Sequence, residues 1–313
     1  MLIQQHLDLA SLTDDILGLH RAIGVDYIAI MHPPSPRPSD DGEVWHRAQR
    51  KVQSHRMKLY NIGLRPDPQI IHARAERDLH VEGWRNLIRN MGAAGIPTLG
   101  YNFRGIGNFR TESAVGRGGA RYSTFDYGEF QADPPSHPDL QIGEEKLREN
   151  LRYFVEAIVP VAEEAGVVLT MHPDDPPRPE PLAGAARVLS TLDDFEHLFD
   201  AVPSPSNAML FCQGCVAEMD QDIPTAIRRI AAHGKIGTVH FRNIRGSSRR
   251  FEEVFIDEGD HDMLLAMQTY RDVGFAGPFM MDHTPGLQQP DARFVGLALV
   301  VGYMRALIQA VYR

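Results

Sequence analysis

Short apolar runs alternate with longer amphipathic segments along most of the chain. The short runs are rich in β-branched residues and span about four to eight positions, as buried strands do. We expect strands at 2–6, 25–31, 58–63, 96–103, 167–172, 207–212, 236–241 and 278–282. The longer segments repeat their apolar positions with a helical period. They predict helices at 13–23, 43–56, 75–94, 144–165, 192–200, 223–232, 262–273 and 292–311.

Several of the predicted helices end on a glycine that directly precedes the next strand. These residues are Gly24, Gly95, Gly166, Gly234 and Gly274. Alternation of strand and helix indicates a parallel sheet. Eight strands and eight helices in 313 residues predict one (β/α)8 barrel domain spanning 1–313. A doubly wound open sheet is the alternative, disfavoured as a dinucleotide fold because no Gly-x-Gly-x-x-Gly follows the first strand.

One stretch, 104–143, breaks the alternation after the fourth predicted strand. It shows no clear helix or core strand and is rich in Gly, Arg, Ser and Pro. A long insertion of this kind in a compact domain is usually a lid, a binding loop or a disordered segment. Because it follows the carboxyl end of a strand, it belongs to the catalytic face of a barrel. We expect a lid or a subunit contact.

Composition narrows the class of protein. The chain is 43% hydrophobic and 23% charged, which is ordinary for a soluble globular protein. A net charge of −9 argues against a general nucleic-acid binder. We expect no membrane span, since no apolar run approaches the roughly 20 residues required. With only two cysteines and no secretory signal pattern, we expect a cytoplasmic protein without structural disulfides.

The predicted strand 167–172 ends on a histidine and runs into His172-Pro173-Asp174-Asp175-Pro176-Pro177. The prolines fix φ and remove backbone donors, so this loop is stiff. It brings a nitrogen donor and two carboxylates together at a strand end, where α/β proteins keep their chemistry.

Four consecutive predicted strands end on residues that can bind a metal: His172, Cys212, His240 and Asp282. Each alone is more often structural. In a barrel, however, consecutive strand ends meet around one mouth, so the four side chains can converge on one point. Two imidazoles, a thiolate and a carboxylate suit a divalent first-row metal. This ligand set does not distinguish among Zn, Fe, Co and Mn.

Cys212-Gln213-Gly214-Cys215 also has the spacing of a redox dithiol or of half a zinc site. A second C-x-x-C is missing from the sequence, which excludes a four-cysteine zinc site within this chain. We expect Cys215 to be a packing or pocket residue.

The chain resembles the mannonate dehydratases, sugar-acid lyases with a (β/α)8 barrel. The resemblance runs from about residue 101 to 282 and is carried by these motifs: Tyr101-Asn102-Phe103, His172-Pro173-Asp174-Asp175-Pro176-Pro177, Phe211-Cys212-Gln213-Gly214, His240-Phe241-Arg242-Asn243 and Asp282-His283. The segment 104–143 stands where the family usually has a Trp-Thr-Arg element.

The resemblance implies dehydration of D-mannonate to 2-keto-3-deoxy-D-gluconate with Mn²⁺ or Fe²⁺ as cofactor. By that resemblance, His172, Cys212, His240 and Asp282 are the metal ligands, and His283 is the acid/base group.

Further residues are candidates for binding the substrate. We expect Asn102 to contact it, Asp174 and Asp175 to hold its hydroxyls or orient the ligand histidines, and Arg242 and Asn243 to bind its carboxylate. For the two aspartates, capping of the next turn is an equally good interpretation. Arg104 and Arg110 are weaker candidates for the carboxylate.

Two other functions stay open. One is a metal-dependent sugar isomerase or epimerase on the same barrel, and the other is a non-catalytic sugar-acid binding protein. We expect a small sugar acid as the ligand, no nucleic-acid or membrane partner, and a homodimer.

Overall fold

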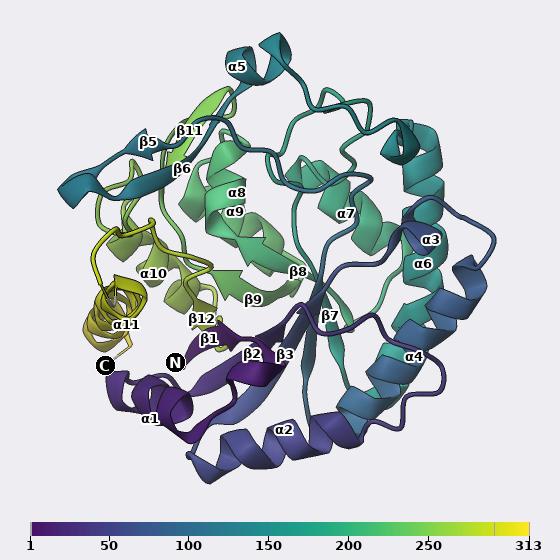
Figure 1. Cartoon of the computed structure of the whole chain (residues 1–313), viewed down its shortest axis with the longest axis horizontal. Coiled ribbons are helices and arrows are strands. Elements are labelled where there is room, and N and C mark those ends of the chain that lie inside the picture. The colour runs from purple at the N-terminus through teal and green to yellow at the C-terminus, as the bar shows by residue number, and fades with distance from the viewer. Residues whose placement is uncertain (1, 291, 313) are drawn as a thin grey trace.

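The computed structural model describes every residue except 1, 291 and 313, and its centre is a closed barrel of eight strands (Figure 1). Around the barrel the order is β1-β12-β9-β8-β7-β4-β3-β2, and every neighbouring pair is parallel. The barrel strands are β1 (Ile3–Leu7), β2 (Tyr27–Met31), β3 (Lys58–Leu64), β4 (Thr98–Tyr101), β7 (Val168–Met171), β8 (Asn207–Cys212), β9 (Ile236–His240) and β12 (Phe279–Met280). The predicted fold and its eight strands are confirmed.

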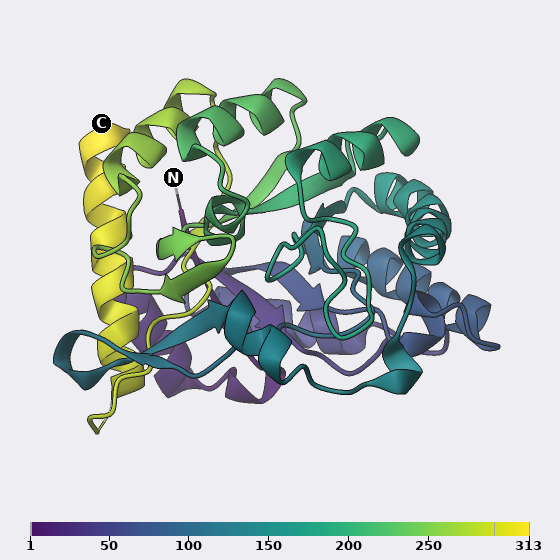
Figure 2. The ribbon, with the colours of Figure 1, turned by 90° about the horizontal axis from the view of Figure 1, so that it is seen from above.

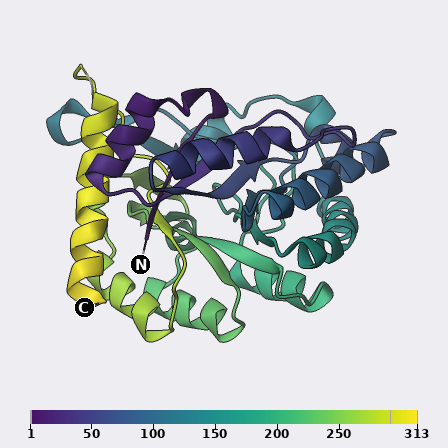
Figure 3. The same cartoon turned by 90° about the horizontal axis from the view of Figure 1, so that it is seen from below.

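The predicted helices form the outer layer of the barrel. They are α1 (Asp14–Ile23), α2 (Glu43–Ser54), α4 (Arg77–Ala93), α6 (Glu144–Ala165), α7 (Leu192–Ala201), α9 (Ile223–Ala232), α10 (Met263–Asp272) and α11 (Ala292–Val311). Three short helices among the described residues were not predicted: α3 (Pro68–Ile71), α5 (Tyr127–Ala132) and α8 (Gln213–Glu218). Figure 3 shows α11 between α1 and α10, where it completes the ring of helices.

Residue chemistry explains where these elements begin and end. The Thr191 side chain caps α7 in a reciprocal capping box with Asp194. Gly166 ends α6 with φ of 66°, a left-handed conformation that glycine adopts without a steric penalty, and β7 starts two residues later. Each helix then packs its apolar face on the barrel, and β8 is buried along its whole length.

The insertion after β4 is more ordered than expected. It contains β5 (Ala114–Val115), β6 (Arg121–Asp126) and α5 (Tyr127–Ala132), with short 3₁₀ turns at Arg117–Gly119 and Pro138–Leu140. Together with the hairpin β10 (Ile244–Ser247) and β11 (Arg250–Glu253), it forms a four-stranded sheet in the order β10-β11-β6-β5. Figure 2 shows this sheet beside the barrel, with the β5–β6 hairpin reaching toward α11.

The sequence showed no clear helix or core strand in 104–143, whereas the structure has a helix there and two strands that belong to a sheet outside the barrel. The physical reason is that β6 pairs with β11, which lies more than 100 positions later in the chain. Phe125 of β6 and Phe251 of β11 pack with ring centroids 5.8 Å apart. Such pairing depends on tertiary contact, so the local sequence shows only a weak pattern of apolar and polar residues.

Helix α11 contradicts the statement that no apolar run in the chain approaches the length of a membrane span. Residues 294–311 have a mean hydropathy of 1.8 over 18 residues, which by length and composition alone is enough to cross a membrane. In the structure this helix packs on α10, α1 and β1, and 28% of the window is buried. Val300, Val301 and Met304 belong to the core on its buried side.

Candidate metal centre and active-site cavity

The four predicted ligands lie together at the mouth of the barrel. One donor atom from each of His172, Cys212, His240 and Asp282 lies within 4.8 Å of the others. The rings of His172 and His240 have centroids 5.4 Å apart, and His240 Nδ1 lies 3.6 Å from Asp282 Oδ2. Two nitrogens, one sulfur and one carboxylate oxygen gathered in this way are a donor set that can hold a metal ion.

Strand ends position these side chains. His172 follows β7 directly, Cys212 and His240 are the last residues of β8 and β9, and Asp282 lies two residues after β12. Cys212 pairs with His240 in the register of the parallel sheet, so the two ends lie level. His172 Nδ1 donates a hydrogen bond to its neighbour's carbonyl, Pro173 O, at 2.7 Å, which leaves Nε2 free to act as a ligand.

The electrostatics of the four residues suit a cation. Burial disfavours the Cys212 thiolate, but a hydrogen bond from Cys215 and the positive charge of Arg242 overcome this and hold its pKa well below the ordinary value. Burial likewise opposes ionisation of Asp282, and His240 and His283 reverse the effect and hold its pKa well below the ordinary value. His240 Nδ1 is buried without a hydrogen-bond partner in the described chain. The residues therefore fit a divalent metal.

Behind Cys212 lies a buried arginine that touches both thiols. Arg242 is 1% exposed, and its Nη2 lies 3.5 Å from Cys212 Sγ and 3.3 Å from Cys215 Sγ. It is ion-paired with Glu218 at 3.2 Å and, more closely, with Glu253. Gly214 makes room for this guanidinium, because a Cβ there would lie 2.6 Å from the guanidinium carbon. Burial raises the pKa of Cys215 well above the ordinary value, so it remains a thiol.

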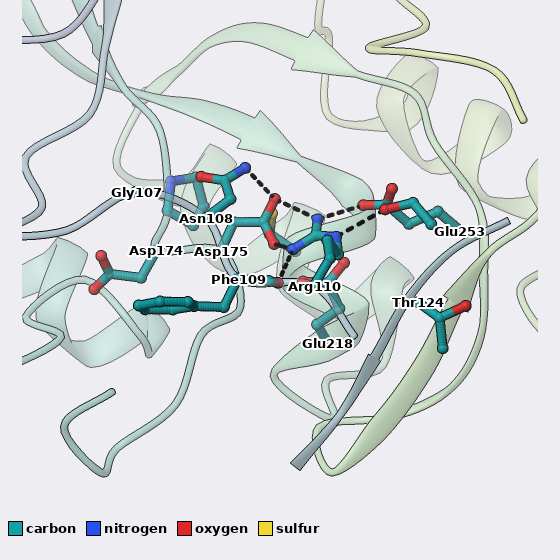
Figure 4. Close-up of polar contacts among 12 residues, drawn as sticks. Gly107, Asn108, Phe109, Arg110, Thr124, Asp174, Asp175, Glu218 and Glu253 are labelled. Atoms are coloured by element: carbon teal, nitrogen blue, oxygen red, sulfur yellow. Dashed lines mark hydrogen bonds and ion pairs between the residues drawn. The ribbon is translucent and has the colours of Figure 1, made fainter. Parts of the chain in front are cut away.

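A second arginine reaches into the same region from the insertion (Figure 4). Arg110 contacts Asp175 at 2.8 Å and Glu253 at 2.6 Å, and Asn108 donates to Asp175 at 3.2 Å. Asp175 and Glu253 are almost fully buried, so each needs a partner of opposite charge. Arg110 thus joins the loop after β7 to the hairpin strand β11.

A further group, made of Asp175, Cys215 and Glu218, also has donor atoms within 4.8 Å of one another. The guanidinium groups of Arg110 and Arg242 already balance its carboxylates. Burial raises the pKa of Glu218 well above the ordinary value, and the charge of Arg242 opposes this shift. We interpret this group as part of the ion-pair network around the two arginines.

His283 lies beside the metal centre and lines the cavity. Its Nε2 is 3.2 Å from Glu253 Oε2 and 3.7 Å from Asp282 Oδ2, and its side chain is 42% exposed. Partial burial opposes the charged imidazolium, but Glu253 and Asp282 outweigh it and raise the pKa of His283. Glu253 therefore orients a histidine that faces the cavity.

The cavity at the barrel mouth has a volume of about 580 Å³. It brings together three of the proposed ligands (His172, His240 and Asp282) with His283, Asn102 and Asp175. Other lining residues were not assigned to the site from the sequence or were only weak candidates, among them His6, Asn61, Arg65 and Arg104. His6 ends the predicted strand 2–6, and Arg65 lies two residues after the predicted strand 58–63, so closeness to a strand end is the signal that could have found them.

Three predicted substrate contacts lie outside the cavity, which corrects those expectations. Arg242 is enclosed by Glu218 and Glu253. Asn243 donates to the carbonyls of Ile256 and His261. Asp174 accepts from the Leu189 amide at 2.8 Å and from Ser190, which matches the capping interpretation.

The D-mannonate dehydratase (UxuA) family model matches residues 138–313 of the chain. A mannonate dehydratase of Enterococcus faecalis is 30% identical over 315 residues, covering 85% of this chain and 87% of that protein. Another, from Thermotoga maritima, is 28% identical over 246 residues, covering 66% of this chain and 67% of that protein.

Solved structures agree with these sequence matches. Mannonate dehydratase from Streptococcus suis serotype 2 superposes with a TM-score of 0.88 at 25% identity and covers 99% of this chain and 94% of that one. D-Psicose 3-epimerase from Clostridium cellulolyticum H10 gives a TM-score of 0.66 at 12% identity, over 98% of this chain and 99% of that one. The second likeness shows the barrel fold alone.

The ion-pair network predicts a large loss of stability in Arg110→Met. This variant leaves Asp175 and Glu253 buried with less compensation, so we expect its free energy of unfolding to fall by about 3–5 kcal/mol. Arg250→Met is the matched control, because its side chain is 68% exposed and its ion pair is a surface one worth at most about 1 kcal/mol. Urea unfolding measures both, and an equal loss in the two variants contradicts the network.

Proposed function

The chain belongs to the D-mannonate dehydratase family, and on that premise we propose that it is a hydro-lyase converting D-mannonate to 2-keto-3-deoxy-D-gluconate and water. The observation that carries the proposal is the convergence of His172, Cys212, His240 and Asp282 beside a cavity that three of them line together with His283. A binding protein would not need an ion-paired histidine beside a metal site.

We propose these four residues as the ligands of a divalent cation, Mn²⁺ or Fe²⁺. Carboxylate and imidazole ligands suit both ions, and the thiolate favours iron. When bound, such a cation supplies Lewis-acid stabilisation of the negative charge that develops on substrate oxygens.

We assign proton transfer to His283. Dehydration removes the proton at the carbon next to the carboxylate and expels hydroxide from the neighbouring carbon. His283 faces the cavity, and Glu253, 3.2 Å from Nε2, holds the imidazole in one orientation. From that position it can accept the carbon-bound proton or protonate the leaving hydroxide. The enol that forms then becomes the 2-keto-3-deoxy acid.

Asn102 and Asp175 are the predicted substrate contacts that the cavity retains. The Asn102 side-chain oxygen is buried without a hydrogen-bond partner among the described residues, so a substrate hydroxyl can donate to it. Asp175 is held by Arg110 and Asn108, and it lines the cavity as an acceptor for a second hydroxyl.

Incubation of the purified protein with D-mannonate and Mn²⁺ or Fe²⁺ tests the function. We expect wild-type protein to form 2-keto-3-deoxy-D-gluconate. His283→Gln should bind metal normally and lose about two to four orders of magnitude in kcat, the usual contribution of an acid/base group. An epimeric sugar acid as the product would favour the isomerase or epimerase alternative, and binding without turnover would favour a binding protein.

Metal content tests the ligand assignment separately from activity. We expect Cys212→Ala to lose most of its bound metal by elemental analysis. Cys215→Ala is the matched control, because this thiol lies three residues away and is not among the four converging donors. Full metal content in Cys212→Ala would contradict the assignment.

We propose that the insertion 104–143 is a lid over the site. Gly107 and Asn108 line the cavity, and Arg110 ties the segment to Asp175. If the segment closes over bound substrate, D-mannonate should slow proteolytic cleavage within 104–143 and leave cleavage elsewhere unchanged. Equal cleavage rates with and without substrate would contradict a lid.

We also propose a soluble, cytoplasmic homodimer. Val295 and Leu299 of α11, together with Leu264 and Leu265 of α10, are exposed on two helices that contact each other. Apolar residues gathered on one surface are typical of a subunit interface. Sedimentation equilibrium should give twice the chain mass of 35.0 kDa, and the mass of one chain would contradict this prediction.

A further inference from the structure

Two arginines line the active-site cavity without a carboxylate partner. Arg65 directly follows β3, and Arg104 lies three residues after β4. Arg65 Nη2 donates to the backbone carbonyls of Arg104 at 2.7 Å and Gly105 at 3.3 Å. Within the described part of the chain, neither guanidinium forms an ion pair with an acidic side chain.

Arg104 is the more unusual of the two, because it is buried. The residue is only 7% exposed, its Nε has no hydrogen-bond partner among the described residues, and Nη1 reaches only the Asp175 carbonyl at 3.5 Å. A buried cation without a counter-ion is expensive, so proteins keep one where a ligand completes the charge balance.

The acidic side chains nearby already interact with other partners. Asp175 is balanced by Arg110, and Asp174 accepts hydrogen bonds from its own loop and lies 3.8 Å from Arg187. Although the Arg65 residue is exposed as a whole, desolvation of its guanidinium and then the charge of Arg104 lower its pKa to about 10. In a chain with a net charge of −9, this wall of the cavity therefore carries uncompensated positive charge.

We infer that Arg65 and Arg104 form an anion subsite that binds the carboxylate of the sugar acid and so selects acids over neutral sugars. Guanidinium groups bind carboxylates through paired, charge-assisted hydrogen bonds. The inference rests on the proposed function for the identity of the substrate. Binding of the substrate carboxylate was first predicted for Arg242 and Asn243. Here this role belongs to Arg65 and Arg104, which line the cavity.

Calorimetric binding to the metal-free full-length protein tests the subsite without turnover. The ligands are D-mannonate and D-gluconate, each compared with its neutral amide. We expect Arg65→Gln and Arg104→Gln to weaken acid binding by about ten- to a hundredfold, as loss of a hydrogen bond to a charged group does. Amide binding should change by less than about twofold, because only the acid uses the guanidinium charge. Arg228→Gln is the matched control, since Arg228 is exposed on α9.

The same variants separate the subsite from a structural role for these arginines. Loss of acid and amide binding together would mean that the arginines only hold the loop at 104–105, and this would overturn the inference. Wild-type protein that binds acids no better than amides would also overturn it. Because Arg65 is exposed, we expect Arg65→Gln to fold. Its binding of acids and amides therefore tests the subsite even if Arg104→Gln does not fold.

Turnover separates the subsite from the proposed function. Wild-type protein that binds sugar acids through these arginines, yet makes no 2-keto-3-deoxy acid from D-mannonate, would contradict the function and support the subsite. Unchanged kcat and KM for D-mannonate in both glutamine variants would contradict the subsite and leave the function standing.

Discussion

Closure of eight parallel strands into a barrel is the constraint on which the site depends. His172 and Asp282 lie 110 positions apart in the chain, and they meet because parallel strands end at one mouth. The register of β8 against β9 sets Cys212 level with His240. A slip of one residue would turn His240 to the opposite face of its strand, so the metal centre and the hydrophobic packing of the barrel require the same register.

Charge balance around this mouth divides the arginines into two kinds. Arg110 and Arg242 are compensated by Asp175, Glu218 and Glu253. They hold the insertion, the β10–β11 hairpin and the thiol pair in place. Arg65 and Arg104 have no such compensation within the described residues, and they face the cavity. The compensated arginines build the site, whereas the uncompensated ones are suited to recognise an anion.

Much of this arrangement could be predicted from the sequence. Buried parallel strands carry a strong local signal, so strand ends and the residues on them, such as His172 and Cys212, were predicted correctly. The motif around His240 did not show which of its residues face the cavity, because Arg242 is enclosed by Glu218 and Glu253, which come from distant elements. Glu253 itself lies on β11, which pairs with β10 and with the distant strand β6, and the local sequence pattern does not reveal the pairing with β6.

X-ray absorption spectroscopy of the zinc-substituted protein tests the central claim most directly. The four converging donors predict one sulfur at about 2.3 Å and nitrogen or oxygen neighbours at about 2.0–2.2 Å. Two sulfur neighbours would make Cys215 a ligand, and a shell of nitrogen and oxygen alone would remove Cys212. Either result would contradict a metal centre built from His172, Cys212, His240 and Asp282.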